Sequence, residues 1–147
     1  MIRPATIADL EAIVAANISM AAETENVTLD PQKITPGVAA LLEGKATGHY
    51  YVGTVDEHVV AQTMITFEFS DWRNADVWWI QSVYVTPEHR RQGWYRRLYE
   101  YVQKEAKEAG AAGIRLYVDK RNISAQAVYT RLGMDAEHYQ MFEAMFD

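Results

Sequence analysis

The chain has 147 residues, of which 49% are hydrophobic and 12% aromatic, a composition typical of a folded domain rather than a disordered segment. It contains no cysteine, which excludes disulfides, thiolate metal ligands and a covalent acyl-cysteine intermediate. The net charge of −6 disfavours nonspecific nucleic-acid binding, and no apolar run approaches the roughly 18 residues of a membrane span. We expect a single cytoplasmic domain over residues 1–147, with no nucleic-acid or membrane partner.

The first half of the chain shows the periodicities of a strand, two helices, a hairpin and a long strand. Apolar side chains at helical spacing predict the first helix, and Thr6 with Asp9 resembles a capping box at its start. Pro36 should interrupt or restart the second helix. Two alternating segments flank residues 56–58 and predict the hairpin. The expected elements are strands at residues 2–3, 49–55, 59–69 and 77–85, and helices at 7–22 and 31–43.

The second half predicts a crossover unit followed by a short helix and a tail. Apolar residues recur at helical spacing from Trp94 to about Ala109, and a short apolar strand follows. A helix between two strands makes this part of the sheet parallel and right-handed. The expected elements are a helix at 94–109, a strand at 114–118, a helix at 122–132 and a strand-like tail at 134–146.

A basic island stands between the long strand and the helix that begins at Trp94. Four arginines (residues 90, 91, 96 and 97) lie within eight positions, while the other 10 basic and 20 acidic residues sum to −10. Strand, basic turn with Gly93, then helix is a layout that presents backbone N–H groups to a phosphate. A solvated helix start is the simpler alternative.

Two segments resemble the GNAT superfamily of acyl-CoA N-acyltransferases. PEHRRQGWYRRLYEYV resembles its pyrophosphate-binding motif, Q/R-x-x-G-x-G/A, with Arg90, Gly93 and Tyr95 at the motif positions. NISAQAVYTRLGM (residues 122–134) resembles the family's N-x-x-A-x-x-x-Y-x-x-L-G-M/F segment. The resemblance implies an α+β or α/β fold with a mixed, mostly antiparallel sheet of six to seven strands. About four helices flank this sheet, which splays between its two central parallel strands.

Tyr95 departs from the family motif, which prefers glycine or alanine at that position. The ring must therefore point away from the loop, or the loop must open slightly.

The resemblance also implies acetyl-CoA as co-substrate. The four scattered histidines show no HExxH spacing, so we expect no metal. Backbone N–H groups of residues 91–96 would bind the diphosphate, with Arg90 and Arg91 adding charge. Backbone groups of Val83 and Val85 would pair with the pantetheine amides as an added strand would. The candidate cofactor-binding residues are Val83, Tyr84, Val85, Arg90, Arg91, Gln92, Gly93, Trp94, Tyr95, Arg96, Asn122, Ala125 and Tyr129.

The family pattern assigns Tyr129 the role of general acid toward the departing thiolate, although its spacing alone favours a residue that simply packs the helix. Many relatives carry a glutamate at the place of Gln81, and glutamine can orient water or an amine but cannot accept a proton. Glu68 or a water chain is the next candidate base, and Glu68 could equally be a solvated strand residue.

The acceptor site is the least determined part of the sequence. Glu23 and Glu25, in the polar stretch 22–30 that we expect to be a loop, could attract a cationic amine together with Asp71 and Trp72. Solvated loop residues are the default interpretation of all four.

The function expected from these residues is transfer of acetyl from acetyl-CoA to a primary amine of a small molecule or amino-acid derivative, by direct attack in a ternary complex. A protein N-terminus or lysine as acceptor is an alternative. A non-catalytic acyl-CoA-binding sensor is another, and Gln81 favours it. Exposed aromatic residues are compatible with a homodimer, as they are with a packed core.

Overall fold

The computed structural model describes residues 1–146, which divide into two compact units. The first is Met1–Tyr117, and the second begins at Val118. The expectation of one domain stays a prediction.

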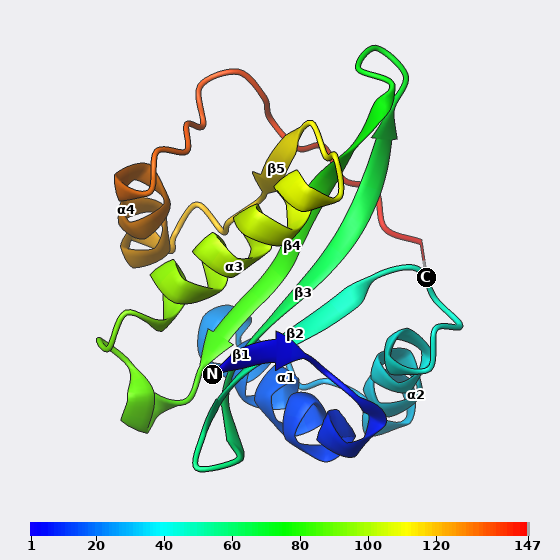
Figure 1. Ribbon diagram of the computed structural model, residues 1–147. Coiled ribbons are helices and arrows are strands. Elements are labelled where there is room, and N and C mark those ends of the chain that lie inside the picture. Colours follow the sequence, from blue (N-terminus) through cyan, green and yellow to red (C-terminus); the bar gives the residue numbers. More distant parts are fainter. Residues whose placement is uncertain (147) are drawn as a thin grey trace. The chain divides into compact units, whose positions relative to one another are not determined.

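The elements follow one another in an order close to that expected from the periodicities (Figure 1). They are β1 (Ile2–Pro4), a 3₁₀ turn (Ile7–Asp9), α1 (Leu10–Glu25), α2 (Pro31–Leu42), β2 (His49–Val55), β3 (His58–Ser70), β4 (Ala75–Val85), a second 3₁₀ turn (Pro87–His89), α3 (Trp94–Glu108), β5 (Gly113–Leu116) and α4 (Ile123–Arg131).

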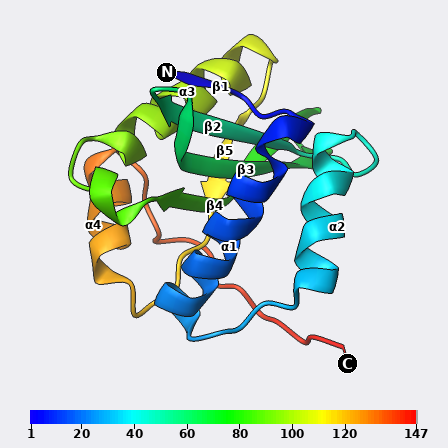
Figure 2. The same cartoon turned by 90° about the horizontal axis from the view of Figure 1, so that it is seen from below.

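The five strands form one mixed sheet in the order β1-β2-β3-β4-β5. All neighbours are antiparallel except β4 and β5, which are parallel, as the crossover through α3 predicts. Helices α1 and α2 lie on one face of this sheet and α3 on the other (Figure 2). The mixed sheet with four helices confirms the expected fold class.

The strand count is lower than the six to seven expected, because the tail 134–146 forms no strand within the described residues. Alternating side chains define the two faces of a potential strand. A strand, however, is stable only when its backbone pairs with a neighbour, which alternation does not specify.

Two helix predictions were wrong in detail. Helix α1 continues to Glu25, so Glu23 and Glu25 lie on its last turn rather than in a loop. Alanine and glutamate are good helix formers, and Asn26 ends the helix in the left-handed conformation, at φ 54°. Helix α2 passes through Pro36 without a break. Pro36 has no N–H to donate to the carbonyl of Gln32. Because Gln32 is exposed, this carbonyl can bind water instead.

The hairpin is confirmed, with Asp56 and Glu57 as its two turn residues. Their φ angles of 48° and 66° are those of a type I′ turn, whose twist matches the flanking strands.

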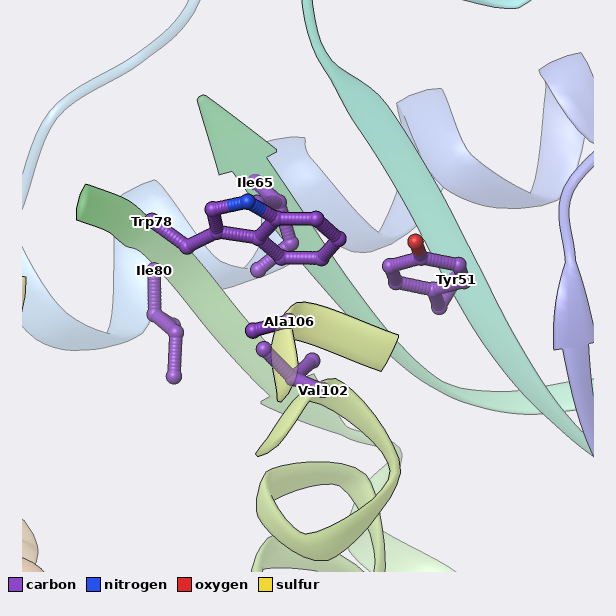
Figure 3. Close-up of a cluster of buried hydrophobic side chains, with 6 residues drawn as sticks. All are labelled: Tyr51, Ile65, Trp78, Ile80, Val102 and Ala106. Carbon is purple, nitrogen blue, oxygen red and sulfur yellow. The ribbon is translucent and has the colours of Figure 1, made fainter. Parts of the chain in front are cut away.

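The main core lies between the sheet and α3. Figure 3 shows Trp78 and Ile80 of β4 facing Val102 and Ala106 of α3, all at most 7% exposed. This stripe of α3 repeats at helical spacing, so burial of one face fixes both the rotation and the position of the helix on the sheet.

Helix α1 is fixed to the opposite face by apolar packing and by a buried polar chain. Ile13 is fully buried against β2. Gln62 Nε2 donates to Asn17 Oδ1 at 3.2 Å, and Asn17 Nδ2 donates to the Tyr50 hydroxyl at 3.0 Å. Because these bonds cross from α1 to β2 and β3, they set the register of α1 as well as its distance from the sheet.

Replacing Asp9 with asparagine (D9N) should destabilise the protein by about 2 kcal/mol at neutral pH. The reason is that the Asp9 carboxylate is partly buried and accepts three hydrogen bonds. Arg3 donates to both of its oxygens, at 2.8 and 3.0 Å, and the Thr6 N–H donates at 2.8 Å. These bonds, the Arg3 bond first, lower the pKa of Asp9.

A lowered folded-state pKa contributes stability above the unfolded value of about 3.9, and this stability is lost as the pH falls through the folded value. Urea unfolding should therefore show a difference in the free energy of unfolding between wild type and D9N that is smaller at pH 3 than at pH 7. Glu11→Gln, an exposed change on α1, should shift stability by less than about 0.5 kcal/mol. An equal difference in the free energy of unfolding at both pH values would contradict this role of the Asp9 carboxylate.

Candidate active site

The turn between β4 and α3 has the backbone geometry of an anion-binding loop. Arg91 and Gly93 have φ angles of 62° and 80°, in the left-handed region, and α3 begins at Trp94. Left-handed residues near a helix start turn successive N–H groups toward one side, which makes a concave donor site. Glycine meets this requirement freely at position 93, whereas Arg91 adopts it at a cost of about 1 kcal/mol.

The N–H groups of residues 91–96 are unpaired donors. In the described part of the chain, none of them donates to a backbone or side-chain acceptor, and the first bond of the helix runs from Arg97 N–H to Gly93 O at 3.0 Å. Such a row at the positive end of a helix dipole fits a diphosphate.

Trp94 anchors this turn in the core. Its side chain is 3% exposed and packs with Val85 and Leu98. Tyr95 is half-buried and packs against the same cluster.

Beside the turn, one edge of β4 pairs with no other strand of the described residues beyond Ile80. Its ladder with β5 ends where Ile80 pairs with Leu116, while β4 continues to Val85. The Thr86 N–H donates to Val60 O at 2.9 Å, and alternation along an antiparallel ladder then directs the main-chain groups of Val83 and Val85 away from β3. The groups of Val83 can accept an extended ligand as a sheet edge accepts a strand, whereas Val85 O already accepts a bond from Arg90 Nε.

Arg90 is an ion-pair partner in the structure. Its Nη2 donates to Glu23 Oε2 at 2.7 Å and its Nε to Val85 O at 3.0 Å. Glu23 Oε1 also accepts from the Tyr84 hydroxyl at 3.1 Å. Burial, then the Glu23 carboxylate, raises the pKa of Tyr84, so its hydroxyl remains a donor at neutral pH. The sequence predicts Glu23 as a residue of the acceptor site and Arg90 as a residue that binds the diphosphate. It gives no sign that the two side chains contact each other.

Gln81 is the extra residue of a β-bulge. Met64 pairs with Ser82 and Ile65 with Ile80, which leaves Gln81 without a partner in β3. Its amide donates to Thr66 Oγ1 at 2.7 Å and accepts from the Tyr117 hydroxyl at 2.9 Å. These two bonds fix the orientation of the amide, and the contribution of Tyr117 has no signal in the sequence.

Glu68 lies on the same face of the sheet but is already paired. Its Oε1 accepts from the Trp79 indole at 3.0 Å and from Arg115 at 2.9 Å. These bonds, the indole first, lower the pKa of Glu68. A lowered pKa makes a carboxylate a weaker base.

Asp71 and Trp72 lie in the turn between β3 and β4. Trp72 is 93% exposed, and the Asp71 carboxylate accepts a local bond from the Trp72 N–H, at 2.9 Å. Ala75, where β4 begins, is six residues from Gln81, which is about 20 Å along a strand. The structure therefore does not bring these two residues together with Gln81.

The second unit carries Asn122, Ala125 and Tyr129 on α4 and its cap. Asn122 Oδ1 accepts from the Ala125 N–H at 3.1 Å, so capping accounts for the asparagine. Tyr129 is half-buried on the helix. Side-chain ligand atoms of Asp135, Glu137 and His138 lie within 4.8 Å of one another, but all three are exposed, and such groups are common without an ion.

The sequence matches the acetyltransferase (GNAT) family over residues 16–134, a span that includes the donor row, the open edge and Tyr129. The chain belongs to the GNAT family of acetyltransferases, which are acyl-CoA N-acyltransferases. No curated protein matches the chain.

Solved structures agree with this assignment. A possible acetyltransferase from Clostridium difficile 630 is 44% identical, with a TM-score of 0.93 over 100% of this chain and 97% of that one. An aminoglycoside acetyltransferase from an uncultured soil metagenomic sample, solved with sisomicin, is 15% identical (TM-score 0.82; 100% and 96% covered). A ribosomal-protein-alanine N-acetyltransferase from Brucella melitensis biovar Abortus 2308 is also 15% identical (TM-score 0.82; 100% and 99% covered). The last two share the fold alone.

Within residues 1–146, no helix combines the length and apolar character needed to cross a membrane.

Proposed function

We propose that the protein transfers an acetyl group from acetyl-CoA to the primary amine of a small molecule or an amino-acid derivative. The observation that carries the proposal is that two binding features follow each other along the chain. The open edge of β4 is followed, after a short turn, by the row of unpaired N–H groups at 91–96. An extended, amide-bearing ligand with a diphosphate at one end matches both features at once.

In this proposal the amine attacks the thioester directly, and the chain has no cysteine that could form an acyl-cysteine intermediate. The amine nitrogen forms a bond to the thioester carbonyl carbon, and the carbon–sulfur bond breaks. Tyr129 donates its proton to the departing thiolate and regains one from water. A backbone N–H near Val83 stabilises the oxyanion of the tetrahedral intermediate.

The amine loses its proton to water rather than to a carboxylate. Gln81 cannot accept a proton, and the bonds that lower the pKa of Glu68 make it a poor base. Gln81 instead presents a fixed amide that orients the amine or its water. The protein N-terminus or lysine remains the alternative acceptor, and a non-catalytic sensor remains the alternative role.

Release of free thiol from acetyl-CoA, measured with and without a panel of primary amines, tests the proposal. We expect amine-dependent release together with formation of an N-acetyl product, detected by mass spectrometry. Coenzyme A binding without amine-dependent release would support the sensor instead. Absence of coenzyme A binding by calorimetry would reject both roles.

A further inference from the structure

The last turn of α1 is tied to the turn that precedes α3 by a network of three side chains. Glu23 binds Arg90 and the Tyr84 hydroxyl, and Arg90 reaches back to Val85 O. The Arg90 guanidinium also lies over the Tyr84 ring, 5.5 Å from its centroid. We propose that Glu23 is a positioning residue for the cofactor loop, acting through Arg90, and not a ligand of the acceptor amine. This inference rests on the proposed function.

The position of Glu23 in its helix needs an explanation. A carboxylate in the last turn faces the negative end of the helix dipole, which is locally unfavourable. The pair with Arg90 is about 40% exposed on each side, and pairs of this kind contribute little to stability. Its effect is therefore geometric: the carboxylate uses one oxygen for Tyr84 and the other for Arg90.

Both ends of the network are held firmly. Helix α1 is fixed by buried Ile13 and by the Asn17 bonds, so the backbone of Glu23 has little freedom. Tyr84 is 6% exposed within β4. Arg90 is therefore located by groups on α1 and β4 that are themselves immobilised.

Arg90 directly precedes the strained part of the loop. Arg91 holds a left-handed conformation that arginine rarely adopts, and the unpaired N–H row begins with this residue. Such a conformation persists where its surroundings enforce it. With Arg90 bound to Glu23 and Val85, the chain enters Arg91 in one direction, and the N–H groups are aligned before a ligand arrives. Preorganised donors bind more tightly than donors that must be ordered on binding.

The test is a double-mutant cycle on coenzyme A affinity, measured by calorimetry with coenzyme A alone. Glu23→Gln should weaken binding about tenfold. In the Arg90→Ala background the same change should have less than about a twofold effect, because the partner through which Glu23 acts is gone. Glu11→Gln, an equal loss of charge at the other end of α1, should bind as wild type does. Thermal unfolding of each variant verifies that it is folded.

Steady-state kinetics separates positioning from acceptor binding. E23Q should raise KM for acetyl-CoA and leave KM for the amine unchanged. A raised amine KM with unchanged coenzyme A affinity would overturn the inference, as would losses that add in the double variant. If wild type binds coenzyme A and E23Q binds it equally, the inference alone fails. If wild type does not bind coenzyme A, the proposed function fails with it.

Discussion

Replacing Tyr129 by phenylalanine is expected to lower kcat about 100-fold with no change in coenzyme A affinity, the loss typical of a general acid. The thiolate of coenzyme A needs a proton as the carbon–sulfur bond breaks, and phenylalanine keeps the ring of Tyr129 while removing the donor. The tyrosine lies within the family match, in the segment that resembles the family's own. Single-turnover rates with acetyl-CoA and a saturating amine measure the effect directly.

Tyr139→Phe is the matched control, since it removes an equivalent hydroxyl from the same unit at an 80% exposed position. It should leave kcat within about twofold of wild type. A Y129F enzyme with wild-type kcat would reject the acid role. A Y129F enzyme that melts early and loses coenzyme A affinity would show that Tyr129 acts by packing.

Replacing Gly53 with alanine (G53A) is expected to destabilise the protein by about 2–3 kcal/mol, because the core has no space for a methyl group at this position. A β-carbon on Gly53 of β2 would overlap Cζ3 of Trp94 and lie 2.9 Å from its Cε3. Trp94 is also the first residue of α3. The collision should therefore displace the N–H row, so weaker coenzyme A binding should accompany the lower stability. Urea unfolding and calorimetry measure the two effects.

Gly37→Ala is the control, because no atom lies within 4 Å of a β-carbon at that position in α2. It should stabilise the protein by about 0.5–1 kcal/mol through helix propensity. Adding Trp94→Phe, which lacks the colliding ring atoms, should recover part of the loss in the Gly53 variant. A G53A protein as stable as wild type would contradict this account of the packing.

The sequence was most informative where structure depends on neighbouring residues. The crossover of β4, α3 and β5 follows from apolar periodicity together with Gly93. The hairpin between β2 and β3 is confirmed for the same reason. Capping, turn formation and amphipathic spacing all act within a few residues, so the local sequence encodes them.

The candidate site was predicted less completely, because its side chains meet across long separations. Glu23 and Arg90 are 67 positions apart, and each has a plausible role of its own in the sequence, the acceptor for one and the diphosphate for the other. From the sequence, Glu68 could equally be a base or a solvated strand residue, and the structure places Arg115 beside it. The pairing of charges depends on strand order and register, and neither can be read from one segment alone.

By itself the sequence determined the family, the mixed sheet and the strand, basic turn and helix around Gly93, since two local motifs and a 3.6- or 2-residue period carry that information. Only the tertiary structure decided which side chains around the turn are already paired or packed and which remain able to bind a ligand. It brought Glu23 and Arg90 together, packed Tyr95 against a buried cluster and placed Gln81 in a β-bulge, and within the described residues the tail pairs with no strand. Periodicity assigns a side chain to a face, whereas packing decides which other side chain it meets there.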